Sequence, residues 1–224
     1  MKRITVLIPT RNREAKLMAT LRTLPVALHS WLDVLVVCDG DPGTAAAVRA
    51  LGNDRISVME VWGSARRSDP IGAVAARNAA SPAIEDGLLY ATDDVLFAPG
   101  AISKCLDQFN SLWPDDDGAL GLRQSQAHHP AGVGLLGKRF LDRYPARKPF
   151  CPLYHHFACQ EIEWLASKVG RWAVTEEVML AHRHPCFDKA QMDQTHRDAR
   201  THREADLAIL QDRNAEGLIW GDSQ

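Results

Sequence analysis

The fold is decided by residues 4–13, which read ITVLIPTRNR. The first five, Ile4 to Ile8, form a short apolar run rich in β-branched side chains, which is typical of a strand buried on both faces. Pro9 ends that strand, and a helix is expected from Glu14 onward. Its apolar residues recur at spacings of three and four, so they lie on one face of the helix. These residues are Leu17, Met18, Leu21 and Leu24.

The same alternation continues outward along the chain to about residue 100. Further strands are expected at 33–38, 56–61 and 88–91, and further helices at 44–51 and 71–80. Strands that alternate with helices predict an α/β fold with a mostly parallel central sheet and crossover helices on its faces.

The second half of the chain has a less regular pattern. Its expected helices are 101–113, 161–169 and 203–214, and its expected short strands are 119–122, 133–136 and 174–181. The sequence has no internal repeat and no linker rich in glycine, proline or serine. We therefore expect one domain over residues 1–224.

Composition excludes several classes of protein. With 46% hydrophobic residues in 224, the chain can bury a sizeable core, which excludes disorder. Only 15 glycines and 12 prolines exclude a collagen-like architecture. A formal net charge of −2 provides no overall field that would attract nucleic acid or an acidic membrane. No nucleic-acid partner is expected.

The expected location is the cytoplasm. The five cysteines are an odd number without a C-x-x-C pair, a pattern typical of reduced thiols. No apolar run approaches the 18 residues that a membrane-spanning helix needs, so no span is expected. The apolar run near the start is too short for a signal peptide.

Polar residues follow three of the expected strands where each strand ends. They are Thr10 to Arg13, Asp39 to Asp41, and Thr92 to Asp94, and the helix at 71–80 adds Arg77. Taken singly, such residues are often helix caps. Ligands of open parallel sheets, however, bind beyond the carboxyl ends of the strands, so we expect a single site there.

Asp93 and Asp94 give this site its chemistry. Adjacent carboxylates repel each other unless a cation or an arginine neutralises them. Magnesium typically binds one or two protein carboxylates together with substrate phosphates. The pair therefore predicts a site for a metal-bound diphosphate.

Other nucleotide and ester chemistries are disfavoured because their motifs are missing. The sequence contains no G-x-x-x-x-G-K-[ST] loop, no G-x-G-x-x-G after the first strand and no G-x-S-x-G elbow. A P-loop kinase, a dinucleotide-dependent dehydrogenase and an α/β-hydrolase are thus disfavoured.

Four segments, in order, resemble the inverting nucleotide-sugar glycosyltransferases of the GT-A fold, glycosyltransferase family 2 in particular. They are ITVLIPTRNR (4–13), LVVCDGDPG (35–43), AARN (75–78) and YATDDVLFAPG (90–100). The resemblance implies a GT-A fold with three parts: a nucleotide-binding half (1–105), an acceptor and catalytic half (106–186) and a C-terminal helical tail (187–224).

The resemblance also implies where the donor binds. Thr10, Arg11 and Asp39 would hold the nucleoside, with Asp39 at the base, while Arg77 would approach the pyrophosphate. The implied donor is a nucleotide sugar, with UDP-sugars favoured, and the acceptor is unknown. Cys38 stands where the family usually has the first acid of the second strand's pair.

A divalent cation, Mn²⁺ or Mg²⁺, is the implied cofactor. Asp94 matches the second acid of the family's D-x-D and would bind the cation, Asp93 matches the middle position, and Thr92 replaces the first acid. His184 would be a further metal ligand, with His182 as the alternate. Imidazole is a poor ligand for Mg²⁺, which favours Mn²⁺.

The catalytic base is expected on the helix that begins near residue 161. Inverting transfer needs a carboxylate that takes the proton of the acceptor hydroxyl. Glu161 is the first candidate and Glu163 the second, and a different alignment places the family's acid at Cys159.

Three alternatives remain open. The fold could be a catalytically impaired relic that still binds sugar or nucleotide. A sugar nucleotidyltransferase is disfavoured because PTRNREA, after the first strand, has no glycine. A structural zinc site is also conceivable, because zinc prefers nitrogen and sulfur ligands. Its candidate ligands are Cys151, His155, His156, Cys159, His182, His184 and Cys186.

Overall fold

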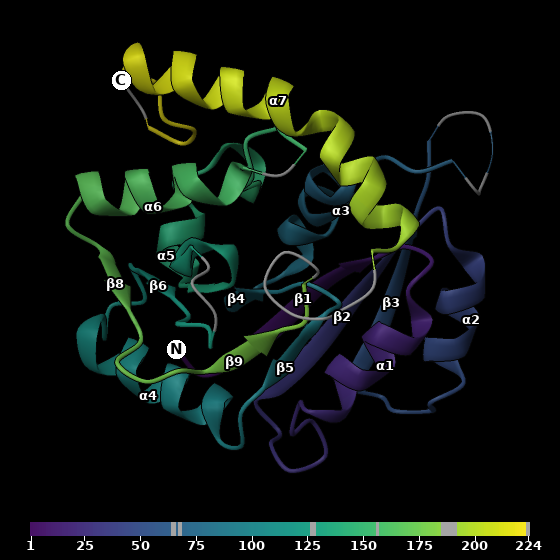
Figure 1. The fold of residues 1–224 in the computed structure, drawn as a ribbon. Coiled ribbons are helices and arrows are strands. Elements are labelled where there is room, and N and C mark those ends of the chain that lie inside the picture. The colour runs from purple at the N-terminus through teal and green to yellow at the C-terminus, as the bar shows by residue number, and fades with distance from the viewer. Residues whose placement is uncertain (64–65, 67–68, 126–128, 156, 185–191, 223–224) are drawn as a thin grey trace.

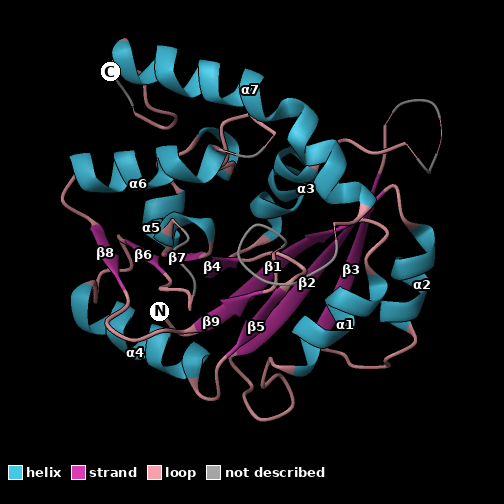
Figure 2. Ribbon diagram, viewed as in Figure 1, coloured by secondary structure: helices cyan, strands magenta, loops and turns pink. Residues whose placement is uncertain are grey.

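The computed structural model describes residues 1–63, 66, 69–125, 129–155, 157–184 and 192–222. A seven-stranded sheet with the strand order β3-β2-β1-β4-β7-β6-β8 forms its centre, and β5 pairs with β9 beside it (Figures 1 and 2). The strands are β1 (Ile4–Thr10), β2 (Leu32–Asp39), β3 (Ile56–Val61), β4 (Gly87–Tyr90), β5 (Val95–Phe97), β6 (Ala119–Gly121), β7 (Gly134–Leu136), β8 (Trp172–Val174) and β9 (Leu180–His182).

The helices flank this sheet. They are α1 (Glu14–Arg22), α2 (Pro42–Arg49), α3 (Ala73–Ala80), α4 (Ala101–Leu112), α5 (Lys138–Leu141), α6 (Ala158–Lys168) and α7 (Gln194–Ala215), with the 3₁₀ turns η1 (Ser81–Ala83), η2 (Pro130–Gly132) and η3 (Pro145–Arg147). The predicted α/β fold with a mostly parallel sheet is confirmed.

The first four strands create the topological feature on which the site depends. β1 pairs in parallel with β2 on one side and with β4 on the other. The chain moves outward from β1 through β2 to β3 and then returns to place β4 on β1's free side. The strand order therefore reverses between β1 and β4, and the crevice at such a switch point is where open α/β sheets bind ligands.

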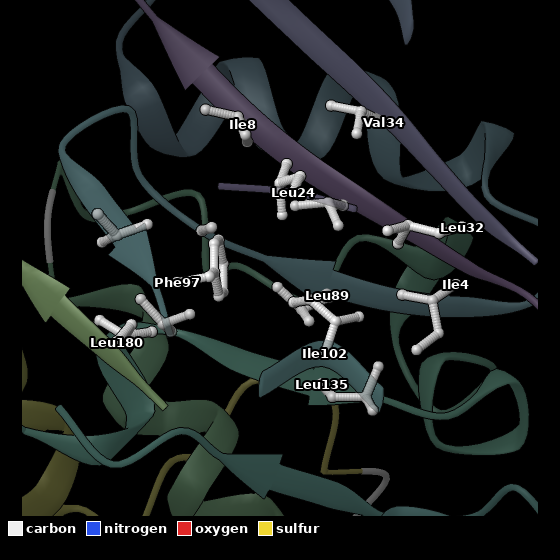
Figure 3. Close-up of a cluster of buried hydrophobic side chains, with 14 of the residues drawn as sticks. Ile4, Ile8, Leu24, Leu32, Val34, Leu89, Phe97, Ile102, Leu135 and Leu180 are labelled. Atoms are coloured by element: carbon white, nitrogen blue, oxygen red, sulfur yellow. The ribbon is translucent and has the colours of Figure 1, made fainter. Parts of the chain in front are cut away.

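Two buried hydrophobic clusters cover the two faces of the sheet. One cluster joins β1, β2 and β4 to residues of α1, α2 and α4, and Figure 3 shows its packing around Ile8, Leu89 and Ile102. The other includes Leu7 of β1 and residues of α3, α5 and α6, and it reaches Leu210 of α7. Because both faces of the sheet are buried, its strands read as continuous apolar runs.

The structure changes several sequence-based boundaries: β1 continues through Pro9 to Thr10, α6 begins at Ala158, and two further changes are larger. The strand expected at 174–181 is two strands: β8 pairs with β6 in the main sheet, whereas β9 leaves that sheet and pairs antiparallel with β5. The helix expected at 203–214 begins nine residues earlier, at Gln194. The segment 194–202 is polar, without apolar periodicity, and tertiary contacts hold it in place.

The longer α7 connects distant parts of the molecule. It begins beside the carboxyl ends of β1 and β2 and runs over α3 toward α6 (Figure 1). The Thr195 hydroxyl donates a hydrogen bond to the Arg11 carbonyl at 3.1 Å near its start, and Arg213 pairs with Glu161 of α6 near its end. In the residues that the structure describes, no helix is both long and apolar enough to cross a membrane.

Gly137, the residue before α5, lies in close contact with Asp116 and Phe109, so a substitution there tests how tightly this region is packed. A Cβ atom there would lie 2.2 Å from the backbone oxygen of Asp116 and 2.7 Å from Phe109 Cζ. Backbone cannot yield as a flexible side chain does, so we expect Gly137→Ala to lower the free energy of unfolding by about 2 kcal/mol, as overpacking typically does. Urea denaturation measures this change.

Gly43 supplies the matched control. A Cβ there would make only an ordinary contact, 3.7 Å from Asp41 Oδ1, within α2. Gly43→Ala should therefore leave stability unchanged or raise it by up to about 1 kcal/mol. Equal losses in both variants would contradict the packing described for Gly137.

Candidate active site

The site lies at the switch point between β1 and β4. The hydroxyl of Thr10, the last residue of β1, donates a hydrogen bond to Asp93 Oδ2 at 2.8 Å. Asp93 and Asp94 follow β4 and are only 3% and 4% exposed. Two buried carboxylates thus lie at the switch point of the strand order, the position where open α/β sheets bind ligands.

Arg13 provides the positive charge that these carboxylates require. Its Nη1 lies 2.9 Å from Asp93 Oδ1 and 3.4 Å from Asp94 Oδ2. Its Nε and Nη2 donate to the two carboxylate oxygens of Asp193, just before α7, at 2.9 and 3.1 Å. Asn12 precedes Arg13 with a left-handed φ of 54°, and its N–H donates to Asp41 Oδ2. One guanidinium therefore links three carboxylates from two distant parts of the chain.

Asp94 accepts contacts on both of its oxygens. The Thr92 hydroxyl donates to Oδ1 at 2.8 Å, and His182 Nε2 lies 3.1 Å from the same oxygen. His196 Nε2, from α7, lies 3.6 Å from Oδ2. Thr92, at the position where the resemblance expects the first acid of a D-x-D, donates to Asp94 and so orients its carboxylate.

The two carboxylates differ in their protonation. Burial alone would raise the pKa of Asp94, but the hydrogen bonds from His182 and His196 and the charge of Arg13 outweigh burial and hold this pKa well below its usual range. Burial raises the pKa of Asp93, as does the charge of Asp94, against the opposing charge of Arg13. Of the two, Asp94 is thus the carboxylate that stays ionised to the lower pH.

The structure separates the two candidate histidine ligands. His182, the alternate, contacts Asp94 directly. The centre of the His184 ring lies 4.7 Å from the centre of the His196 ring and 5.5 Å from that of the His182 ring. Burial, with a smaller effect of His196, lowers the pKa of His184 to about 4, so its ring is neutral near pH 7.

The donor set fits a divalent cation. Across the residues that the structure describes, no three or more histidine, cysteine, aspartate or glutamate side chains form a ready-made metal site. The Asp94 oxygen and His182 nitrogen that face each other are nevertheless ligand types that Mn²⁺ binds, and substrate phosphates usually complete the coordination of such ions. Asp94 and His182 are therefore the residues here that would suit a divalent cation.

The zinc alternative gains no support. Two of its proposed ligands, His156 and Cys186, lie outside the described residues. Within the described residues, no three or more histidine, cysteine, aspartate or glutamate side chains lie together as zinc ligands.

Asp39 and Arg11, expected at the nucleoside, make internal contacts. The Asp39 carboxylate accepts hydrogen bonds from the backbone N–H groups of Ile71 and Gly72 at 2.7 and 2.8 Å and so fixes the segment that leads into α3. Gly72 has a φ of 92°, which favours glycine. Arg11 Nη1 lies 3.5 Å from Asp198 Oδ2, on α7.

Arg77, on α3, is buried near the carboxylates with hydrogen-bonding capacity to spare. It is 7% exposed, its Nη2 donates to the Ala91 carbonyl at 3.1 Å, and its guanidinium lies 5.2 Å from the centre of the Phe150 ring. Its Nε has no hydrogen-bond partner in the described part of the chain. Burial lowers the pKa of Arg77, against the opposing charges around it. A buried cation with an unused donor suits an anionic ligand.

The two candidate bases differ sharply. Glu161 is fully buried and accepts hydrogen bonds from the Tyr154 hydroxyl, from Arg213 Nε and Nη2, and from the backbone N–H of Trp220. These contacts give Glu161 a structural role, tying α6 to α7. The side chain of Glu163 is 25% exposed and lies 3.2 Å from His129 Nε2.

Sequence reasoning missed three residues of the site: Arg13, Asp193 and His196. Arg13 lies in the polar cluster after the first strand, where no sequence pattern distinguishes it from Arg11. Asp193 and His196 form a capping box at the start of α7, and this D-x-x-H spacing was the available signal. Only the fold places that capping box against β1.

Comparisons with known proteins agree with this architecture. No family model and no curated protein matches the sequence. Among solved structures, the mannosyltransferase PcManGT of Pyrobaculum calidifontis, in complex with GDP-Man and Mn²⁺, matches with a TM-score of 0.64 and 17% identity, over 92% of this chain and 61% of that one. TarS residues 1–349 of S. aureus match with a TM-score of 0.58 and 13% identity, over 80% and 60%.

Further TarS structures, with UDP and with UDP-GlcNAc, match with TM-scores of 0.59 and 0.56. The chain thus spans about three fifths of the length of PcManGT and of TarS 1–349. At these identities the likeness establishes the fold, and the GT-A-like glycosyltransferase fold expected from the sequence is confirmed.

The contrast between Glu161 and Glu163 can be tested by stability. Glu161→Ala leaves Arg213 without its partner, and breaking a buried ion pair typically costs 3–5 kcal/mol, so we expect a loss of about 3 kcal/mol in the free energy of unfolding. Glu163→Ala, at a half-exposed pair, should lose less than about 1 kcal/mol. Chemical denaturation of both variants gives the comparison, and similar losses would refute the structural role of Glu161.

Proposed function

We propose that this chain is a metal-dependent inverting glycosyltransferase that moves a sugar from a nucleoside-diphosphate donor to an acceptor hydroxyl. One observation carries the proposal: an ionised carboxylate, Asp94, lies between two imidazoles at the switch point of a fold shared with structures that hold nucleotide sugars. The same crevice has Arg77 as a buried positive charge.

The donor would bind beyond the carboxyl ends of β1, β2 and β4. Arg77, with its unused Nε donor, would contact the pyrophosphate. Asp39 would act at the nucleoside mainly by holding the 71–72 segment in place, and Thr10 by fixing Asp93. The resemblance of the sequence favours UDP, whereas PcManGT was solved with GDP-Man, so both donor types need testing.

Asp94 and His182 would hold the cation, with His184 adjacent. A divalent cation there offsets the charge that develops on the departing nucleoside diphosphate, an effect worth several kcal/mol. Arg13 and Arg77 supply further positive charge from within the site. Because Arg13 already neutralises Asp93 and Asp94, these carboxylates stay close together before any ligand binds.

Glu163 is the carboxylate that we assign as the base that deprotonates the acceptor hydroxyl. A base must reach solvent to meet an incoming hydroxyl, and Glu163 does so while Glu161 is enclosed. The neutral thiol of Cys159, at the alternative position, is no base. Glu163 would take the acceptor's proton as the oxygen attacks the anomeric carbon, which inverts the configuration there.

Replacing Asp94 tests the core of the proposal. A screen of UDP- and GDP-sugars for hydrolysis, with and without Mn²⁺, should identify a donor for the wild-type chain. Asp94→Ala should then lower the rate on that donor at least about 100-fold, since it removes the cation's anchor. Direct binding of Mn²⁺ to the protein should be lost as well.

Asp107→Ala, which removes an exposed carboxylate on α4, is the control and should keep the wild-type rate. A rate for Asp94→Ala equal to the control's would overturn the assignment of the site. If no donor is hydrolysed but the chain still binds nucleotide, the alternative of a catalytically impaired relic would be favoured instead.

Glu163→Gln tests the base separately. The amide keeps the size of the side chain but does not accept a proton, so kcat for transfer should fall about 10²–10⁴-fold while KM for the donor stays near its wild-type value. Steady-state transfer assays with the donor from the screen give both constants. If kcat is unchanged, Glu163 is not the base and another group must take the acceptor's proton.

A further inference from the structure

Gln124 is a buried side chain that no part of the proposed mechanism uses. It is 6% exposed and lies in the segment that follows β6. This segment is locked beside the start of β9, because Met179 N donates to the Arg123 carbonyl at 2.8 Å and Ser125 N to the Leu180 carbonyl at 2.9 Å. The backbone therefore fixes Gln124 relative to His182, at the end of β9.

The contacts of Gln124 determine how its amide is oriented. Nε2 donates to the backbone carbonyl of His129 at 3.4 Å, and Oε1 lies 3.0 Å from His182 Nδ1. A backbone carbonyl only accepts hydrogen bonds, so the NH₂ group must face His129. Oε1 consequently faces His182, and since it too only accepts, His182 Nδ1 must carry a proton.

The opposite nitrogen of His182 is fixed as a consequence. With Nδ1 protonated toward Gln124, Nε2 is the ring nitrogen that faces Asp94. Nε2 lies 3.1 Å from Asp94 Oδ1, and a proton between these two atoms makes the hydrogen bond described above. A divalent cation would take the place of that proton and bind the lone pair of Nε2.

We propose that Gln124 is a positioning residue that fixes His182 in the Nδ1–H tautomer and so presents Nε2, beside Asp94, to a divalent cation. The inference rests on the proposed function, because it concerns that same cation. It assigns the histidine ligand to His182 in place of His184. Histidine ligands are commonly held by such a bond from the other ring nitrogen, and its loss typically costs 10–100-fold in metal affinity.

The first test measures the affinity of the protein for Mn²⁺ alone, without nucleotide, by electron paramagnetic resonance. Gln124→Met keeps the length of the side chain but removes the acceptor, so the Kd for Mn²⁺ should rise about 10–100-fold. Gln124→Glu keeps an acceptor at His182 but loses the NH₂ group that donates to the His129 carbonyl, so Mn²⁺ should bind it more tightly than Gln124→Met.

Gln108→Met is the matched control. Gln108 is a half-buried glutamine on α4 whose amide contacts backbone groups of Val174 and Glu176. The same chemical change there should leave the Kd for Mn²⁺ unaltered. Thermal unfolding of all three variants shows that each is folded.

A second test observes the protonation of the two ring nitrogens of His182 directly. In protein with ¹⁵N-labelled histidine and bound Cd²⁺, which is diamagnetic, NMR should show His182 protonated at Nδ1 and bonded to the metal through Nε2. In Gln124→Met the Nδ1 proton should exchange faster with solvent. Metal bonded to Nδ1, or an Nδ1 proton unaffected by the substitution, would overturn the role of Gln124.

The outcomes distinguish this inference from the proposed function. If the wild-type chain binds Mn²⁺ and Asp94→Ala does not, but Gln124→Met binds as tightly as wild type, the positioning role alone fails. If the wild-type chain binds no Mn²⁺, the metal dependence of the proposed function fails, and the inference fails with it.

Discussion

The rest of the site depends on the contacts that Arg13 makes with three carboxylates. Asp93 and Asp94 are adjacent and buried, an arrangement that like-charge repulsion and desolvation would destabilise without a cation. The Arg13 guanidinium offsets that repulsion and also binds Asp193, just before α7. The same side chain therefore keeps the carboxylates together and attaches the last helix over the crevice.

This arrangement explains why α7 belongs to the site. Asp193 also pairs with Lys16 of α1 and caps its own helix, and His196 one turn later reaches Asp94. At the far end, Arg213 and Glu161 anchor α7 to α6. The two ends are fixed by buried or half-buried charges, which explains how a helix with a largely polar sequence is held on the protein.

Much of the first half was predictable, because its strands are buried on both faces. Runs such as Ile4–Ile8 and the alternating helices determine a parallel sheet, and the carboxyl ends of parallel strands meet at one edge. That reasoning located Asp93 and Asp94 correctly. The second half was less predictable: a single apolar run there became β8 and β9, since pairing with β5 and β6 is settled by distant segments.

The sequence by itself determined the fold class, the acidic pair after β4 and the candidate residues around it, because periodicity and strand-end position are local properties. Only the tertiary structure decided which charged groups meet. Arg13 rather than Arg11 contacts Asp93, and His182 rather than His184 contacts Asp94. Glu161 pairs with Arg213, whereas Glu163 is partly exposed. The reason is physical: the role of a charged side chain is set by its partners and its burial. Asp193 lies 180 residues from Arg13 along the chain, and Arg213 lies 52 residues from Glu161.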